Sequence, residues 1–289
     1  LYWICLRVDF KFWLTWPHLT TDVVKVLKIM VPGTIGAGVM QINLFIDMML
    51  ASFLPTGSLS YLYYADRLNH LPLSIFGVAI GTALLPSLSR CWRQGNHQQA
   101  HHQQSIALEF AMQLTIPAAT GLIVLSYSLI DLVFGHGHFT TKDVQATAAV
   151  LAAFAFGLPA YVAGKVFAKT PVKVAVVCIF ANLGLNLLLI PFFKHVGMAL
   201  ATSLAAWINT ALLAILLRKR GLFHFSRMLL KNTAKITLTS LLMAAILAGI
   251  QYLYPIIDFD STFKILGVLA WVGLGIVFYL SIGYGLGIR

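Results

Sequence analysis

Apolar windows of about twenty residues recur along the whole chain and constrain its fold most strongly. Such a window is long enough to cross the hydrocarbon layer as a helix, and few other structures can span a bilayer. Eight windows are present, at residues 23–53, 59–88, 106–134, 144–167, 172–193, 197–217, 236–254 and 263–285. With 59% hydrophobic and 10% charged residues, no soluble domain is visible. We therefore expect an all-α fold, a polytopic membrane helix bundle of about eight transmembrane helices.

The basic residues predict the orientation of this bundle. Sixteen of the twenty Lys and Arg residues lie in connections or near window ends on one side, and Arg67 lies deeper inside an apolar window. The other side holds only Lys142, Lys194 and Lys264. Because cytoplasmic connections carry the excess of Lys and Arg, the richer side is predicted to be cytoplasmic. The net charge of +11 thus indicates membrane orientation, and no nucleic-acid partner is expected.

The windows divide the chain into four parts. Residues 1–22 look like the end of a truncated span and a cytoplasmic connection, and residues 23–217 like a six-helix lobe. Residues 218–235 form a basic cytoplasmic connection, and residues 236–289 hold two C-terminal helices. The chain has no initiator Met and no cleavable signal peptide, so we expect it to begin inside a larger protein.

Arg67 is the first candidate functional residue. It lies in residues 63–68 (YYADRL), inside the apolar window 59–88. A charged side chain at the centre of a membrane helix costs at least about 2.5 kcal/mol, so it normally faces a partner or a water-filled cavity and marks a substrate path. The alternatives are that Arg67 pairs with Asp66 or snorkels to an interface. Adjacent helix positions do not face each other, which disfavours the pairing.

Polar side chains in three other windows form a second candidate site. Asp47 lies mid-window and shares a helix face with Asn43. Carboxylate, amide and hydroxyl oxygens are the hard ligands that a small cation such as Na⁺ needs. The candidate Na⁺ ligands are Asp47, Asn182, Asn186, Met198 and Thr202. The alternative is an interhelical hydrogen-bond cluster around a neutral Asp47, since polar side chains commonly join membrane helices.

Several segments, taken in order, resemble one known family over nearly the whole chain. They are residues 30–36 (MVPGTIG), 41–43 (QIN), 63–68 (YYADRL), 76–82 (FGVAIGT), 85–90 (LPSLSR), 157–161 (GLPAY), 169–173 (KTPVK) and 197–203 (GMALATS). Together they resemble the MurJ (MviN) family of lipid II flippases, in the multidrug, oligosaccharidyl-lipid and polysaccharide exporter superfamily. The family is built of two six-span lobes plus two final helices. This chain resembles only the C-terminal part, which is the second lobe and the final pair. The resemblance implies that the final pair, residues 236–289, are groove helices that line a groove for the lipid tail.

The resemblance implies a transporter without covalent chemistry, and so not an enzyme. Family members move lipid II, the undecaprenyl-pyrophosphate-linked peptidoglycan precursor, from the cytoplasmic to the periplasmic leaflet by alternating access. The implied protein is a multi-pass monomer in the bacterial inner membrane that serves cell wall synthesis. The implied partners are lipid II, membrane lipids and the missing N-terminal lobe of the same protein.

The resemblance also assigns roles to the candidate residues. Arg67, Asp66 and Ser60 would contact the substrate, because a planar guanidinium binds a pyrophosphate through bidentate, charge-assisted hydrogen bonds. Asp66 would orient or partly neutralise Arg67. Na⁺ would be the coupling ion at the second site, and no other cofactor is implied. Asn186 stands where the family pattern leads us to expect an acidic residue.

Other functions need residues that the windows supply poorly. An intramembrane enzyme acting on lipid-linked phosphates would need paired carboxylates, a His and Arg cluster or a metal site at one depth. The acids within the windows are Asp47, Asp66, Glu109 and Asp131, without an HExxH motif. A cation-coupled multidrug or polysaccharide-lipid exporter of the same superfamily is the alternative transporter. A purely structural subunit would have no use for Arg67 and Asp47 inside the membrane.

Overall fold

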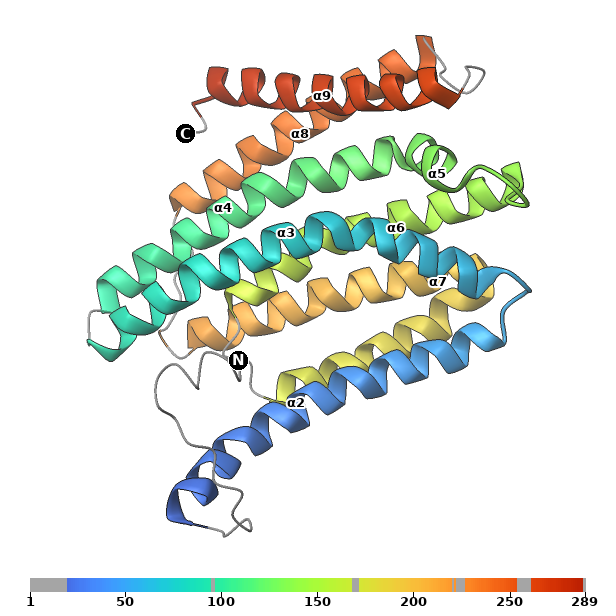
Figure 1. The fold of residues 1–289 in the computed structure, drawn as a ribbon. Coiled ribbons are helices and arrows are strands. Elements are labelled where there is room, and N and C mark those ends of the chain that lie inside the picture. Colours follow the sequence, from blue (N-terminus) through green and yellow to red (C-terminus); the bar gives the residue numbers. More distant parts are fainter. Residues whose placement is uncertain are drawn as a thin grey trace, which may run out of the picture. The chain divides into compact units, whose positions relative to one another are not determined.

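The computed structural model describes residues 20–94, 97–167, 172–219, 221, 227–253 and 261–287, and these residues are helical apart from short turns, without a strand among them. The prediction of an all-α fold is confirmed. The helices are α2 (Thr21–Ser52), α3 (Ser58–Arg93), α4 (His97–Val124), α5 (Ser126–Phe134), α6 (Thr141–Val166), α7 (Val172–Lys219), α8 (Arg227–Leu253) and α9 (Ser261–Gly285) (Figure 1).

The chain forms two compact units, Leu1–Gly38 and Val39–Arg289. In its described residues the first unit consists of the N-terminal part of α2. The second unit contains the rest of α2 and all the other helices, and both candidate sites lie within it.

Five helices of the described residues are long and apolar enough to cross a membrane: His101–Val124, Thr141–Val166, Val174–Lys219, Arg227–Leu253 and Lys264–Gly285. The third of these is a hairpin, because α7 is broken at Lys194, whose φ of 50° and ψ of −127° are not helical. The Cys178 thiol donates a hydrogen bond to Asn209 Oδ1 over 3.4 Å, which holds the two arms side by side. The chain is therefore a multi-pass membrane protein.

The eight predicted windows fall on helices α2 to α9 apart from some end residues, with one internal difference. Windows 23–53 and 59–88 lie on α2 and α3, which are not among the five helices above. Window 106–134 is interrupted at Leu125, which ends α4 and precedes α5. Windows 172–193 and 197–217 are the two arms of α7. Residues 227–235, which the sequence places in a basic connection, are already part of α8.

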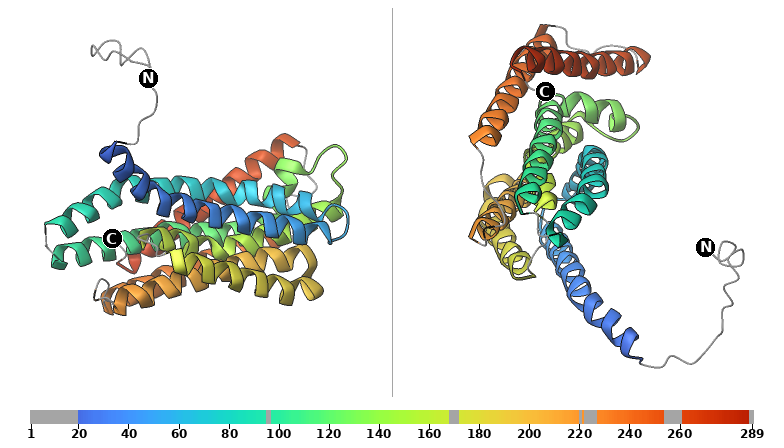
Figure 2. Two further views of the ribbon diagram at one scale, coloured as in Figure 1. Left: turned by 90° about the horizontal axis from the view of Figure 1, so that it is seen from below. Right: turned by 90° about the vertical axis from the view of Figure 1, so that its left-hand side faces the viewer.

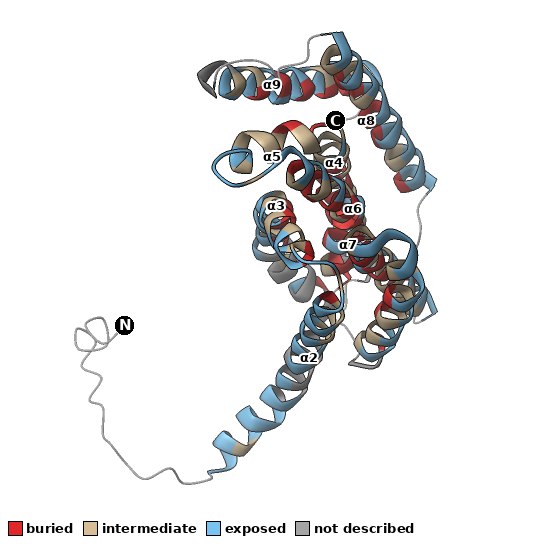
Figure 3. Ribbon diagram, turned by 90° about the vertical axis from the view of Figure 1, so that its right-hand side faces the viewer, coloured by how far each residue is buried: buried red, intermediate tan, exposed pale blue. Residues whose placement is uncertain are grey.

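Helix α6 lies at the centre of the second unit and packs against α3, α4, α5 and α7. Buried residues occupy most of its length, whereas α8 and α9 present mainly exposed residues (Figure 3). It begins with a capping box, in which Thr140 and Asp143 satisfy each other's backbone N–H groups. The Tyr61 hydroxyl donates to Asp143 Oδ1 over 2.5 Å and so ties the start of α3 to the start of α6.

Hydroxyl groups on the C-terminal arm of α7 donate hydrogen bonds to backbone carbonyls of α6 and so form a ladder between the two helices. Ser203 Oγ donates to the carbonyl of Ala153 over 2.6 Å, and Thr210 Oγ1 donates to that of Ala160 over 2.6 Å. Gly157 makes this approach possible, because a Cβ there would lie 2.7 Å from Ser203 Oγ. Small residues let membrane helices pack at such short distances.

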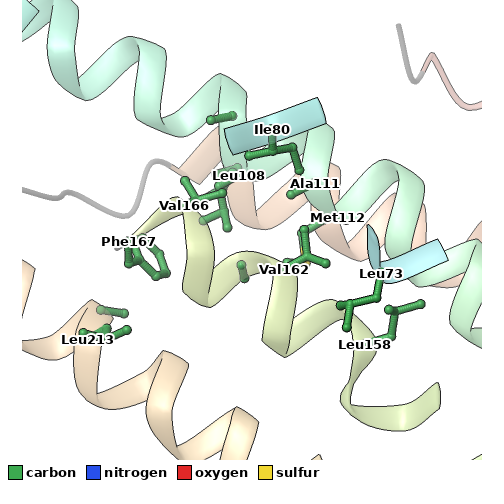
Figure 4. Close-up of a cluster of buried hydrophobic side chains, with 14 of the residues drawn as sticks. Leu73, Ile80, Leu108, Ala111, Met112, Leu158, Val162, Val166, Phe167 and Leu213 are labelled. Atoms are coloured by element: carbon green, nitrogen blue, oxygen red, sulfur yellow. The ribbon is translucent and has the colours of Figure 1, made fainter. Parts of the chain in front are cut away.

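An apolar cluster joins α3 and α4 to this pair (Figure 4). Its members come from five helices, α3, α4, α6, α7 and α8, and include Leu73, Ile80, Leu108, Ala111, Met112, Leu158, Val162, Val166 and Leu213. Helix α3 is therefore held against α6 by packing on one face. Its other face is left open, and that face carries the first candidate site.

Helices α8 and α9 lie beside α4 and α5 (Figure 2). Asn232 of α8 donates a hydrogen bond to Glu109 Oε1 of α4. Lys264 of α9 forms an ion pair with Asp131 of α5 at 3.1 Å. Polar contacts at separate points along the helices thus fasten the C-terminal pair to α4 and α5.

Candidate functional site

Arg67 projects from the open face of α3. Its Nη2 donates a hydrogen bond to the Tyr63 hydroxyl over 2.5 Å, and its guanidinium carbon lies 4.5 Å from the centre of the same ring. Both side chains are exposed. Tyr63 precedes Arg67 by four residues, so helical spacing alone brings the two together. The ring supports one face of the guanidinium and leaves the rest of its donors available.

Asp66 contacts His70, whose Nε2 lies 3.4 Å from Asp66 Oδ1. Among the described residues, no carboxylate lies within ion-pair distance of the Arg67 guanidinium. The structure therefore differs from the alternative in which Arg67 pairs with Asp66, because these neighbours point in different directions on the helix.

Ser60 lies near the start of α3, seven residues before Arg67, and its side chain is exposed. Seven residues make about two helical turns, so Ser60 and Arg67 share one face and are separated by about 10 Å along the helix. The three predicted substrate-binding residues thus lie on one helix. Ser60 and Arg67 share its open face, and Asp66 is half-buried at the side of that face.

Helix α6 adds two residues that the sequence does not single out. Tyr161 lies close enough to Asp66 to be affected by its charge. The ammonium of Lys165 lies 5.1 Å from the centre of the Tyr161 ring. The i, i+4 spacing of Tyr161 and Lys165 could have predicted this pair, but the approach of α6 to α3 could not be read from the sequence.

The open face therefore carries charged and polar groups over several turns. Exposed members on α3 and α6 are Ser60, Tyr63, Arg67, His70, Ser74 and Tyr161. Such groups inside a membrane protein face a water-filled cavity or a protein partner rather than lipid. The arrangement offers a fixed cation and several hydrogen-bond donors to a ligand, without a nucleophile activated by a base.

The second candidate site joins α2 to the N-terminal arm of α7. Asn186 Nδ2 donates to Asp47 Oδ1 over 2.8 Å and to Asn182 Oδ1 over 2.9 Å. Asn43 Nδ2 donates to the other carboxylate oxygen of Asp47 over 3.2 Å. Asn186 is fully buried, and its Oδ1 lacks a hydrogen-bond partner among the described residues. The Asn186 amide thus bridges two oxygens that could otherwise bind a cation.

Met198 and Thr202 lie on the other arm of α7. The Thr202 hydroxyl donates to the Met198 carbonyl over 3.1 Å, within its own helix. Hydrogen bonds thus join Asp47, Asn182 and Asn186, and a separate bond joins Met198 to Thr202. The described residues contain no group of three or more His, Cys, Asp and Glu side chains that could hold a metal ion. Any cation here would depend on amide and carbonyl oxygens beside the single carboxylate.

Comparison with known proteins identifies the chain's relatives. The family model described as "Lipid II flippase MurJ" matches residues 2–279. A "Probable lipid II flippase MurJ" of Rickettsia prowazekii (strain Madrid E) is 35% identical over 292 residues, which cover 98% of this chain and 57% of that protein. The counterpart of Vibrio cholerae is 35% identical over 289 residues, covering 95% and 54%. The chain thus spans about half the length of the curated relatives it matches.

Solved structures give the same result for the fold. The structure titled "Lipid II flippase MurJ, inward closed conformation" superposes with a TM-score of 0.73 at 30% identity, covering 99% of this chain and 59% of that one. An outward-facing multidrug resistance transporter of the MATE family gives a TM-score of 0.55 at 17% identity and covers 90% of this chain. The second likeness concerns the fold alone.

Proposed function

Because this chain belongs to the MurJ family of lipid II flippases, we propose that it forms part of a transporter that moves lipid II from the cytoplasmic to the periplasmic leaflet. The transporter acts as a monomer in the bacterial inner membrane and supplies precursor for cell wall synthesis. It catalyses no covalent reaction. The lobe described here rocks against a second lobe between inward-open and outward-open states, as repeat-built transporters do.

Arg67 binds the pyrophosphate of the substrate in this proposal. The observation that carries it is the exposed guanidinium, which is placed by Tyr63 and has no carboxylate within ion-pair distance among the described residues. A planar guanidinium can donate two parallel hydrogen bonds to a phosphate. Ser60, on the same face, adds a neutral hydrogen bond two turns away. Asp66 and His70 contact each other and leave the Arg67 guanidinium without an ion pair among the described residues.

Na⁺ is the proposed coupling ion at the site of Asp47, Asn182, Asn186, Met198 and Thr202. The donor set fits a small hard cation, and the unpaired Asn186 Oδ1 supplies an oxygen if the amide turns over. A cation held there would join α2 to the hairpin of α7. Such a link biases the lobe toward one conformation only if the cation binds that conformation more tightly.

The test uses the protein as its gene encodes it, expressed in cells depleted of their own lipid II flippase. Arg67→Ala should abolish growth at unchanged membrane levels, and Arg67→Lys should restore it poorly because an ammonium cannot form the bidentate contact. Arg218→Ala, at the exposed end of α7, is the matched control and should support growth. Full growth with Arg67→Ala would refute the assignment.

A further inference from the structure

A second basic residue lies on the same wall as Arg67. Lys165 is in the last turn of α6 and is half-buried. Its side chain runs along α3 at Gly77, where an added Cβ would lie 2.8 Å from Nζ, 3.4 Å from Cδ and 3.6 Å from Cε. Gly77 thus provides the space that the lysine stem and ammonium occupy.

The ammonium of Lys165 lacks a neutralising partner in the described part of the chain. Its Nζ lies 5.1 Å from the centroid of the Tyr161 ring. No carboxylate lies within ion-pair distance of it among the described residues. A ring face stabilises a cation less than an anion does, and a half-buried charge without a counter-ion is costly. The position therefore favours an anionic ligand.

Lys165 and Arg67 lie at different depths. Gly77 follows Arg67 by ten residues on α3, which is about 15 Å along the helix axis. With the orientation predicted from the basic residues, α3 runs from the periplasmic to the cytoplasmic side. Lys165 is then the more cytoplasmic of the two cations. His70, one turn after Arg67 on α3, and Tyr161, one turn before Lys165 on α6, lie between them and provide polar groups along the interval.

We propose that Lys165 is a second pyrophosphate-binding residue, which holds the diphosphate on the cytoplasmic side of Arg67 before the lipid crosses. The proposal rests on the proposed function and extends it to two binding positions on one wall. The ammonium acts as a point charge with three donors and tolerates varied phosphate orientations. The guanidinium of Arg67 then binds the diphosphate in a defined geometry.

The experiment measures binding of undecaprenyl pyrophosphate to the detergent-solubilised protein as its gene encodes it, with undecaprenol as the uncharged control lipid. Lys165→Met keeps the length of the stem and removes the charge. It should weaken diphosphate binding about tenfold, the value of one charge-assisted contact, and leave undecaprenol binding unchanged. Lys219→Met, at an exposed position at the end of α7, should bind as the wild type does.

A second variant perturbs the position of the ammonium without altering any charge. Gly77→Ala places a methyl group against Lys165 Nζ, which is the flexible end of a side chain and can move. Diphosphate binding should weaken a few-fold while the protein remains folded. The melting temperature of the ligand-free protein separates the roles, because Lys165→Met should not lower it if the lysine serves the ligand.

The outcomes distinguish this inference from the proposed function. If Arg67→Ala loses diphosphate binding and Lys165→Met stays within twofold of the wild type, the Lys165 inference is wrong and the flippase proposal stands. If the wild type does not prefer the diphosphate lipid over undecaprenol, both are wrong. A drop in the ligand-free melting temperature of Lys165→Met, matching its loss of binding, would assign the lysine to structure instead.

Discussion

The replacement Asn186→Asp tests how this chain treats a cation at the second site. In the wild type, the Asn186 amide donates to Asp47 Oδ1 and Asn182 Oδ1, over 2.8 and 2.9 Å. These two N–H groups occupy the direction from which a cation would reach both oxygens. The replacement is nearly isosteric, removes both donors and adds a carboxylate. We expect it to turn a site closed by hydrogen bonds into one that requires Na⁺.

The magnitude follows from these contacts. A hydrogen bond to a carboxylate contributes about 1.5 to 3 kcal/mol and one to an amide oxygen about 1 kcal/mol. A cation must displace both in the wild type, a penalty of about 3 kcal/mol or roughly a hundredfold in affinity. The added charge of the variant contributes up to about 4 kcal/mol at 4 Å in an effective dielectric of 20. Repulsion between the two carboxylates consumes part of this, so we expect Na⁺ to bind at least about tenfold more tightly.

The assay is thermal unfolding of the purified protein while Na⁺ replaces N-methyl-D-glucamine at constant ionic strength. The wild type should gain a small increase in melting temperature. Asn186→Asp should begin lower in the absence of Na⁺ and respond at lower Na⁺ concentrations, and Asp47→Asn should not respond. Equal Na⁺ dependence in the wild type and Asn186→Asp would refute the reasoning. No response in any variant would leave the site as an interhelical hydrogen-bond cluster.

Two further predictions concern orientation and packing. The basic connections are predicted to be cytoplasmic. In a protein whose own cysteines have been replaced, Lys219→Cys should therefore resist an impermeant thiol reagent in intact cells, and His138→Cys should react. The opposite labelling pattern would invert the topology. Gly157→Ala should lower the free energy of unfolding by about 2 kcal/mol or more, because its Cβ would lie 2.7 Å from Ser203 Oγ. Gly184→Ala is the control: its Cβ would meet nothing within 4 Å, so the change should be neutral or stabilising. Equal melting temperatures for these two alanine variants would contradict the close contact of α6 with α7.

Sequence reasoning was most successful where one helix face decides the arrangement. Asn182 and Asn186 are one turn apart, and the structure places them together as predicted. The bond from Asn186 to Asp47 crosses 139 positions and joins an amide N–H group to a carboxylate, so a site of converging oxygens stays a prediction. Tyr63 and His70 were within reach of the same reasoning, since each lies four residues from Arg67 or Asp66.

Features that depend on packing between distant segments were not predicted. The Tyr61 bond to Asp143 joins positions 82 apart, and neither residue is unusual for its place in the sequence. Lys165 lies two residues before the end of an apolar window, a position that predicts a charge at the membrane surface. Its direction toward Gly77 depends on how α3 crosses α6. The helix of window 106–134 is also interrupted at Leu125, where no Gly or Pro predicts a break.

The ladder between α6 and α7 has a mechanical consequence. Each hydroxyl of Ser203 and Thr210 is matched to one carbonyl, and Gly157 fits only the small side chain opposite it. Sliding one helix past the other would break both hydrogen bonds together and drive Gly157 against larger groups. We therefore expect α6 and the C-terminal arm of α7 to move as one rigid unit. Displacement must be taken up where the helices pack less extensively, as between α9 and its neighbours α4 and α5.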